Sequence, residues 1–168
     1  MNWEAISAIG EILGALAVVI TLGYLALQIR HTRLEAADIS RQSRAEGVRE
    51  ITLAIGLNEE MSKLWLKASQ SEAIYKEIGE SINMSASEFA RVDNVSLAWI
   101  WMHWGQWAAI KTAEDLAELK HIIGIYYSAP PVSITWGKSP MGKGLLDEGF
   151  VSFVDEMLEE ARVEGSSS

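Results

Sequence analysis

The sequence predicts an all-α protein, in which one N-terminal transmembrane helix continues into a small cytoplasmic helical bundle. Three observations support this prediction. Residues 5–29 form an almost uncharged apolar run, only three of the 168 residues are proline, and no segment alternates apolar and polar residues as a strand would. In addition, helix-capping patterns occur at Ser85 and Thr112.

The apolar run from Ala5 to Ile29 contains a single ionisable side chain, Glu11. At about 1.5 Å per residue, such a helix reaches roughly 37 Å, which is enough to cross a hydrocarbon core of about 30 Å. A cleaved signal peptide would need basic residues before a shorter apolar core, and a buried core helix rarely needs so long a run. We therefore expect a transmembrane helix over residues 5–29, preceded by a short segment of residues 1–4.

Basic residues follow this span, and none precedes it. Lys and Arg are retained on the cytoplasmic side of a membrane, so the pattern predicts an N-terminus outside and a cytoplasmic C-terminal domain. Aromatic rings and arginines favour the headgroup region. The residues expected at the membrane interfaces are Trp3, Tyr24, Arg30 and Arg33.

Small residues recur along the predicted span. Gly10 and Gly14 form a GxxxG motif, and Gly23 lies in a second stripe with Ala15 and Val19. Such stripes allow helix backbones to approach closely in lipid, although a GxxxG match also arises by chance in an anchor rich in Gly and Ala. We predict that Gly10, Gly14 and Gly23 are helix-packing positions.

Beyond the span, residues 30–56 are predicted to continue as a juxtamembrane helix, residues 57–162 to form the helical bundle, and residues 163–168 to be a disordered tail. Within the bundle we expect helices over 59–69 (with Met61, Leu64 and Trp65 on one face), 72–78, from a capping box at Ser85–Glu88 to about Lys111, from a cap at Thr112 onward, and over 146–161. A break is expected at Pro130 and Pro131, and a loop over 137–144.

Tryptophan is concentrated in residues 95–110, within the helix predicted from Ser85–Glu88 to about Lys111. The simplest interpretation is a buried central helix, and a second is a face that contacts the headgroup layer or a partner. Four residues are therefore candidate partner contacts: Trp99, Trp101, Trp104 and Trp107. His103 on the same helix is expected to be a hydrogen-bonded core or interface residue, and it is also a candidate ligand for a cofactor such as haem or a pigment.

Composition and spacing exclude several kinds of chemistry. Cysteine is absent, which excludes disulfides, thiolate metal sites and a cysteine nucleophile. The net charge of −9 argues against a nucleic-acid partner, because phosphate binding needs clustered Lys and Arg. Glu118 and His121 have the Glu-x-x-His spacing of di-iron bundles, but one copy is insufficient, and a solvated helix face explains them. We expect no catalytic residue, no metal site and no cofactor.

The segment Asn2–Glu11, the motif Tyr24-Leu-Ala-Leu-Gln-Ile-Arg30 and the later Phe150–Glu156 resemble a group of uncharacterised bacterial single-pass inner-membrane proteins, which have an N-terminal anchor and a small helical domain. The resemblance covers nearly the whole chain. It departs at the central helix, which is usually rich in Tyr in that group and is rich in Trp here. The resemblance implies a location in the bacterial inner membrane, and it assigns no catalytic residue.

Together these features predict a non-enzymatic accessory or scaffold subunit. Its single span and helical domain would dock onto other subunits of a larger membrane complex, for example an energy-transducing one such as a photosynthetic reaction centre–light-harvesting assembly. Two alternatives remain open. The first is a membrane-tethered bundle that binds a ligand or cofactor through His103 and the Trp-rich helix. The second is a self-associating membrane anchor, that is, a homo-oligomer.

Overall fold

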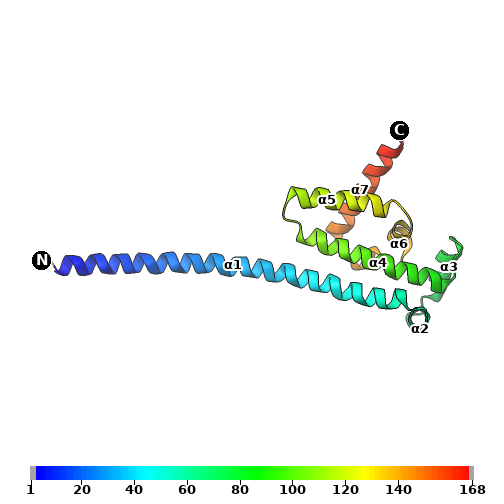
Figure 1. Cartoon of the computed structure of the whole chain (residues 1–168), viewed down its shortest axis with the longest axis horizontal. Coiled ribbons are helices and arrows are strands. Elements are labelled where there is room, and N and C mark those ends of the chain that lie inside the picture. Colours follow the sequence, from blue (N-terminus) through cyan, green and yellow to red (C-terminus); the bar gives the residue numbers. More distant parts are fainter. Residues whose placement is uncertain (1–2, 167–168) are drawn as a thin grey trace. The chain divides into compact units, whose positions relative to one another are not determined.

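The computed structural model describes residues 3–166, and every regular element in that range is helical. The chain divides into two compact units, Met1–Ser40 and Arg41–Ser168, which are considered separately below. The elements are α1 (Trp3–Leu57), α2 (Glu59–Ser69), α3 (Glu72–Glu80), α4 (Ala86–Ala109), α5 (Ala113–Tyr127), α6 (Val132–Lys138), the 3-10 helix η1 (Lys143–Leu145) and α7 (Glu148–Ser166) (Figure 1). The all-α prediction is confirmed.

Helix α1 contains the apolar run and continues without a break through the residues expected to be juxtamembrane. Its last residue is Leu57, because Asn58 takes an extended conformation and its side-chain oxygen accepts a hydrogen bond from the Met61 amide at 3.0 Å. Asn58 thus ends one helix and caps the next. The compact unit of the domain begins at Arg41, within α1, and Ala45 and Ile55 of α1 are buried.

The two caps expected from sequence are both present as reciprocal capping boxes. At the start of α4, the Ser85 hydroxyl accepts from the Glu88 amide, and the Glu88 carboxylate accepts from the Ser85 amide. Thr112 and Asp115 make the same exchange at the start of α5. Each box satisfies amides that the first helical turn leaves without partners, so these helix starts are set by local sequence.

The main hydrophobic core lies where α4 packs against the other helices of the domain. Its fully buried members include Ile100 from α4, Ile123 from α5, and Phe150 and Val154 from α7. A smaller cluster centres on Phe89 and joins α2, α3 and the start of α4. The two clusters explain why α4 is the central helix of the domain.

The last turns of α1 lie close against α4 because small residues occupy the contact. A Cβ atom added to Gly56 would lie 2.9 Å from the Arg91 carbonyl oxygen, and one added to Gly105 would lie 3.1 Å from the Ala45 Cβ. The Arg91 Nε also donates to the Gly56 carbonyl at 3.1 Å. In Figure 1, α4 accordingly lies between these turns of α1 and helix α5.

Some element boundaries differ from those expected. Helix α4 ends at Ala109 rather than near Lys111, and α7 extends to Ser166, into the segment expected to be a tail. The predicted loop over 137–144 contains the end of α6 and the start of η1. The predicted segments 1–4 and 163–168 lie partly outside the described residues.

Candidate functional site

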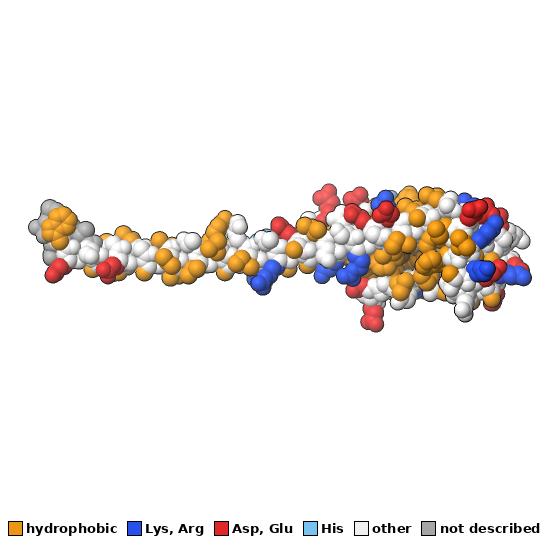
Figure 2. Space-filling model, turned by 90° about the horizontal axis from the view of Figure 1, so that it is seen from below, with side chains coloured by type: hydrophobic (Ala, Val, Ile, Leu, Met, Phe, Trp, Pro, Cys, Tyr) orange, Lys and Arg blue, Asp and Glu red, His pale blue; other side chains and the backbone are white. Residues whose placement is uncertain are grey.

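The first candidate site is the exposed apolar part of α1. Among the described residues, α1 is the one helix that is long and apolar enough to cross a membrane, and none of its most apolar stretch is buried. Figure 2 shows hydrophobic side chains along it. Ile12 is 68% exposed and Val19 is 65% exposed, so nothing within this unit covers the apolar surface.

The predicted packing and interface positions all lie on this exposed surface. A Cβ atom added to Gly10, Gly14 or Gly23 would meet nothing within 4 Å, so these backbone positions are open to a neighbouring helix. Trp3 is 68% exposed and Tyr24 is 61% exposed, and Arg30 and Arg33 are exposed as well. The Tyr24 hydroxyl accepts a hydrogen bond from the Gln28 amide group at 3.0 Å, where the apolar run ends.

The four tryptophans proposed as partner contacts have different environments. Trp101 and Trp104 are buried in the main core. Their ring centroids are 5.3 Å apart, and the rings meet edge to face. Trp107 is half-buried and packs against Phe150. Trp99 is 39% exposed and stacks on the half-exposed ring of Tyr126 at 5.1 Å. The burial of the other rings leaves Trp99 as the member of this set most accessible to a partner.

His103 is enclosed by aromatic rings and is only 1% exposed. Its Nδ1 is 3.3 Å from the Tyr127 hydroxyl, and Trp99 and Tyr126 lie against the same ring. Burial lowers the pKa of His103 to about 4, so the ring is neutral near pH 7. Its Nε2 has no hydrogen-bond partner among the described residues. The ring is therefore a buried core residue, as one of the two interpretations of the sequence expected.

Two polar clusters of the domain were not anticipated from sequence. In the first, the buried Asp93 carboxylate accepts hydrogen bonds from the Tyr75 hydroxyl at 2.7 Å and the Ser139 hydroxyl at 2.8 Å. Burial raises the pKa of Asp93, although the neighbouring hydroxyls act in the opposite direction. No ion pair to Asp93 occurs in the part of the chain that the structure describes.

The second cluster holds the loop before α7 in place. Lys143 donates to Asp155 at 2.6 Å and lies 5.1 Å from the centre of the Trp136 ring, whose Nε1 donates to the same carboxylate at 2.8 Å. Partial burial raises the pKa of Asp155, but the hydrogen bonds from Lys143 and Trp136 outweigh this effect and lower the pKa overall. The ion pair between Lys143 and Asp155, together with the Trp136 hydrogen bond to the same carboxylate, therefore connects α6, η1 and α7.

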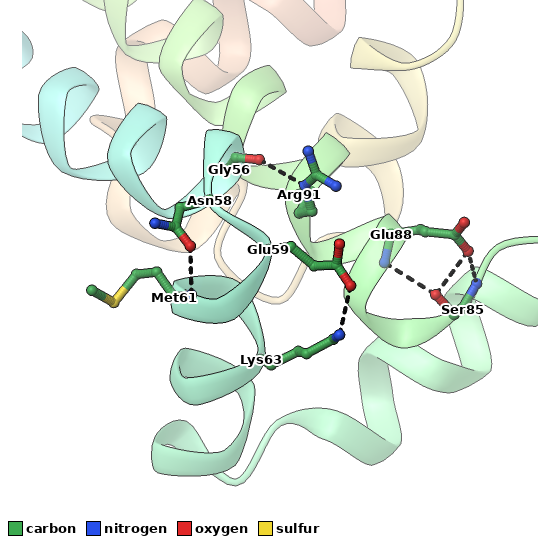
Figure 3. Close-up of polar contacts among 8 residues, drawn as sticks. All are labelled: Gly56, Asn58, Glu59, Met61, Lys63, Ser85, Glu88 and Arg91. Atoms are coloured by element: carbon green, nitrogen blue, oxygen red, sulfur yellow. Dashed lines mark hydrogen bonds and ion pairs between the residues drawn. The ribbon is translucent and has the colours of Figure 1, made fainter.

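A charged hollow of about 860 Å³ lies where α2, α3 and the start of α4 meet. Its charges are largely committed to internal contacts. Figure 3 shows Lys63 paired with Glu59, Glu88 held by Ser85, and Arg91 donating to Gly56. The hollow is therefore best explained as a solvated junction of helices.

The Glu118 and His121 pair lies on an exposed face of α5, and the described residues contain no group of three or more His, Cys, Asp or Glu side chains placed to hold a metal ion. Helix α2 exposes Met61, Leu64 and Trp65, the face noted in the sequence, and buries Ser62 and Leu66.

The chain was also compared with protein-family models, with curated proteins and with solved structures, and no match was found in any of the three comparisons.

Proposed function

We propose that this chain is a membrane-anchored, non-catalytic accessory or scaffold subunit of a larger bacterial inner-membrane complex. The observation that carries the proposal is the uncovered apolar surface of α1, on which Ile12, Leu16 and Ile20 are each more than half exposed. Apolar surface of this extent is costly in water and is favourable in a hydrocarbon core. A lipid bilayer is therefore the proposed environment of residues 5–29.

The proposed orientation follows from charge. Arg30 and Arg33 come directly after the apolar run, and both are exposed on α1. Retention of basic residues on the cytoplasmic side supports an N-terminus outside and a cytoplasmic domain. Protease added to intact spheroplasts should therefore spare the domain, whereas protease added to inverted membrane vesicles should digest it.

Docking onto other subunits is supported by two open surfaces. Gly10 and Gly14 leave the backbone of the anchor accessible to another helix, and Trp99 with Tyr126 forms an exposed aromatic pair on the domain. The enclosure of His103 favours this subunit function over the cofactor-binding alternative.

The test begins with membrane fractionation. The untagged protein should remain in the membrane pellet after alkaline carbonate washing, and mild detergent should release it with partners in fixed stoichiometry, as measured by native electrophoresis and mass spectrometry. A dispersed, intact chain in the soluble fraction without detergent would refute the anchor.

A matched pair of variants tests the proposed docking face of the anchor. Gly14→Leu should abolish partner recovery without lowering the membrane-bound fraction, because the larger side chain separates the helix backbones. Ala26→Leu makes a similar small-to-large change on another face of the helix and should leave partner recovery intact. Equal recovery with both variants would contradict docking through Gly14.

A further inference from the structure

Helix α4 presents a regular seam on the side of the domain away from its main core. The seam consists of Val92, Val95, Trp99, Met102 and Gln106, which follow one another at intervals of three and four residues. Val92, Val95 and Met102 are half-buried. Trp99 is 39% exposed, and Gln106 is exposed. Intervals of three and four are the pattern by which one helix packs against another in a coiled coil. The natural occupant of this seam is therefore another helix.

At one level of α4, a basic side chain lies on one side of the seam and an acidic side chain lies on the other. On the α1 side, Arg49 lines a hollow of about 270 Å³ together with Met102 and Gln106. On the α5 side, Glu118 lines a hollow of about 290 Å³ that also includes Gln106. Both side chains are exposed, and no ion pair of either is found within the described residues.

We propose that the α4 seam binds the α4 seam of a second copy of this chain, with the two helices parallel and in register. A two-fold axis along the seam places the α1 side of one copy against the α5 side of the other. Arg49 of each copy then faces Glu118 of its partner at the level of Gln106. The Arg49 and Glu118 side chains are thus complementary to those of a second copy.

The parallel arrangement deepens the proposed function and depends on it, because two copies anchored in one membrane must cross it in the same direction. Within the domain, the turns of α1 from Ala45 to Gly56 run antiparallel to α4. Antiparallel seams would carry the two Arg41 ends, which lead to the anchors, to opposite ends of the pair. Parallel seams keep both Arg41 ends together.

Two further carboxylates lie next to the charged pair, and each already accepts a hydrogen bond within its own copy. Glu46 lies beside Arg49, and its carboxylate accepts a hydrogen bond from Gln42. Asp115 lies beside Glu118, and its carboxylate is engaged in the capping box of α5. Gln106 occupies a seam position, and a polar side chain there favours one register, since each amide can bond its counterpart across the axis.

The absence of cysteine from the sequence makes a direct test possible. Gln106→Cys in the full-length chain, expressed in its native membrane and treated with a short bismaleimide, should give a cross-linked dimer of this chain. Glu160→Cys, at an exposed position of α7, is the matched control and should remain monomeric. Failure of Gln106→Cys to cross-link, or a cross-link to a different protein, would overturn the proposal.

Exchanging the charges of Arg49 and Glu118 provides a second measurement. Rescue by the exchange would not be expected if these residues only supported the fold of one copy. In the Gln106→Cys background, Arg49→Glu or Glu118→Arg alone should lower the cross-linked fraction roughly fivefold, because both pairs of the dimer become like-charged. The double variant Arg49→Glu/Glu118→Arg should restore it. Absence of restoration would refute the proposed pairing.

The same samples separate this inference from the proposed function. A membrane-bound chain without the cross-link would overturn the dimer and leave the anchor proposal standing. A soluble chain that cross-links and shows charge rescue would support the seam contact and refute the anchor.

Discussion

The apolar part of α1 and helix α4 are both long apolar helices, but they bury their side chains to opposite extents. Leu16 and Ile20 of α1 are 55% and 63% exposed, whereas Ile100 of α4 is fully buried. Apolar composition alone therefore does not distinguish a helix that the chain covers from one that it leaves open.

The difference lies in where polar groups occur. The apolar part of α1 has one ionisable residue between Ala5 and Ile29, and the Thr21 hydroxyl donates within the same helix, to the Ala17 carbonyl at 2.8 Å. Helix α4 buries Asp93 and His103, and each contacts a tyrosine hydroxyl from another helix. A buried polar group needs such a partner, so its presence marks a helix that belongs to a folded core.

The largest expected effect comes from truncating the core. Phe150→Ala should lower the free energy of unfolding of the domain by about 3–5 kcal/mol, because Phe150 is fully buried against Trp107 and Trp136. Leu16→Ala in the apolar part of α1 is the matched control and should leave domain unfolding unchanged. Denaturant titration in detergent measures both. A similar loss for the two variants would remove the distinction between these helices.

A second pair of variants, both on α1, tests the proposed membrane anchor. Ile20→Arg should disfavour membrane insertion by about 3 kcal/mol, because the charge would lie near the middle of the span. Ile51→Arg also places a charge on an exposed isoleucine of α1, but within the domain unit, where Ile51 is 60% exposed. The carbonate-resistant fraction should fall for Ile20→Arg alone. An unchanged fraction would show that residues 5–29 do not depend on lipid.

A buried histidine predicts acid sensitivity of the domain. The pKa of His103 is about 4 in the folded chain, against an ordinary value of 6.5. The unfolded state therefore binds the proton more readily, and stability that is fully present above pH 6.5 is lost as the pH falls toward 4. The difference between the two pKa values corresponds to a loss of on the order of 3 kcal/mol in the free energy of unfolding.

The comparison with His103→Gln isolates this effect. Burial raises the pKa of Asp93, so Asp93 contributes a loss of stability in the opposite direction, as pH rises above its ordinary pKa of 3.8. That contribution is common to both proteins and cancels in their difference. The parent should lose more stability than the variant between pH 6.5 and 4 in chemical denaturation. Parallel profiles would contradict a neutral buried His103.

The features that could be predicted from sequence are local ones. The capping boxes at Ser85 and Thr112 each depend on residues three positions apart, and the apolar run depends on composition alone. The polar clusters could not be found in this way. Asp93 is 18 residues from Tyr75 and 46 from Ser139, and Trp136 is 19 from Asp155, so these contacts exist only once the helices have packed.

Periodicity also leaves open which helix face meets the core. Met61, Leu64 and Trp65 form an apolar face on α2, but the helix instead buries Ser62 and Leu66. In the Trp-rich helix, the pattern gave no basis for separating buried Trp101 and Trp104 from exposed Trp99. Only the positions of neighbouring helices decide such cases, because an almost wholly apolar helix has no marked polar face.

The smallest expected effects separate packed glycines from open ones. Gly79→Ala should destabilise the domain by about 1–3 kcal/mol, because the added Cβ would lie 2.6 Å from the Met84 carbonyl oxygen and the backbone would have to move. Gly124→Ala should instead stabilise it by about 0.5–1 kcal/mol, since its Cβ meets nothing within 4 Å and alanine favours the interior of α5. Thermal unfolding measures both signs. Gly14 in the proposed anchor is equally open, so Gly14→Ala should leave domain unfolding unchanged, and any effect on partner recovery would arise from a neighbouring helix. If Gly79→Ala were more stable than the parent, the close contact between Gly79 and the Met84 carbonyl oxygen would not restrict this position to glycine.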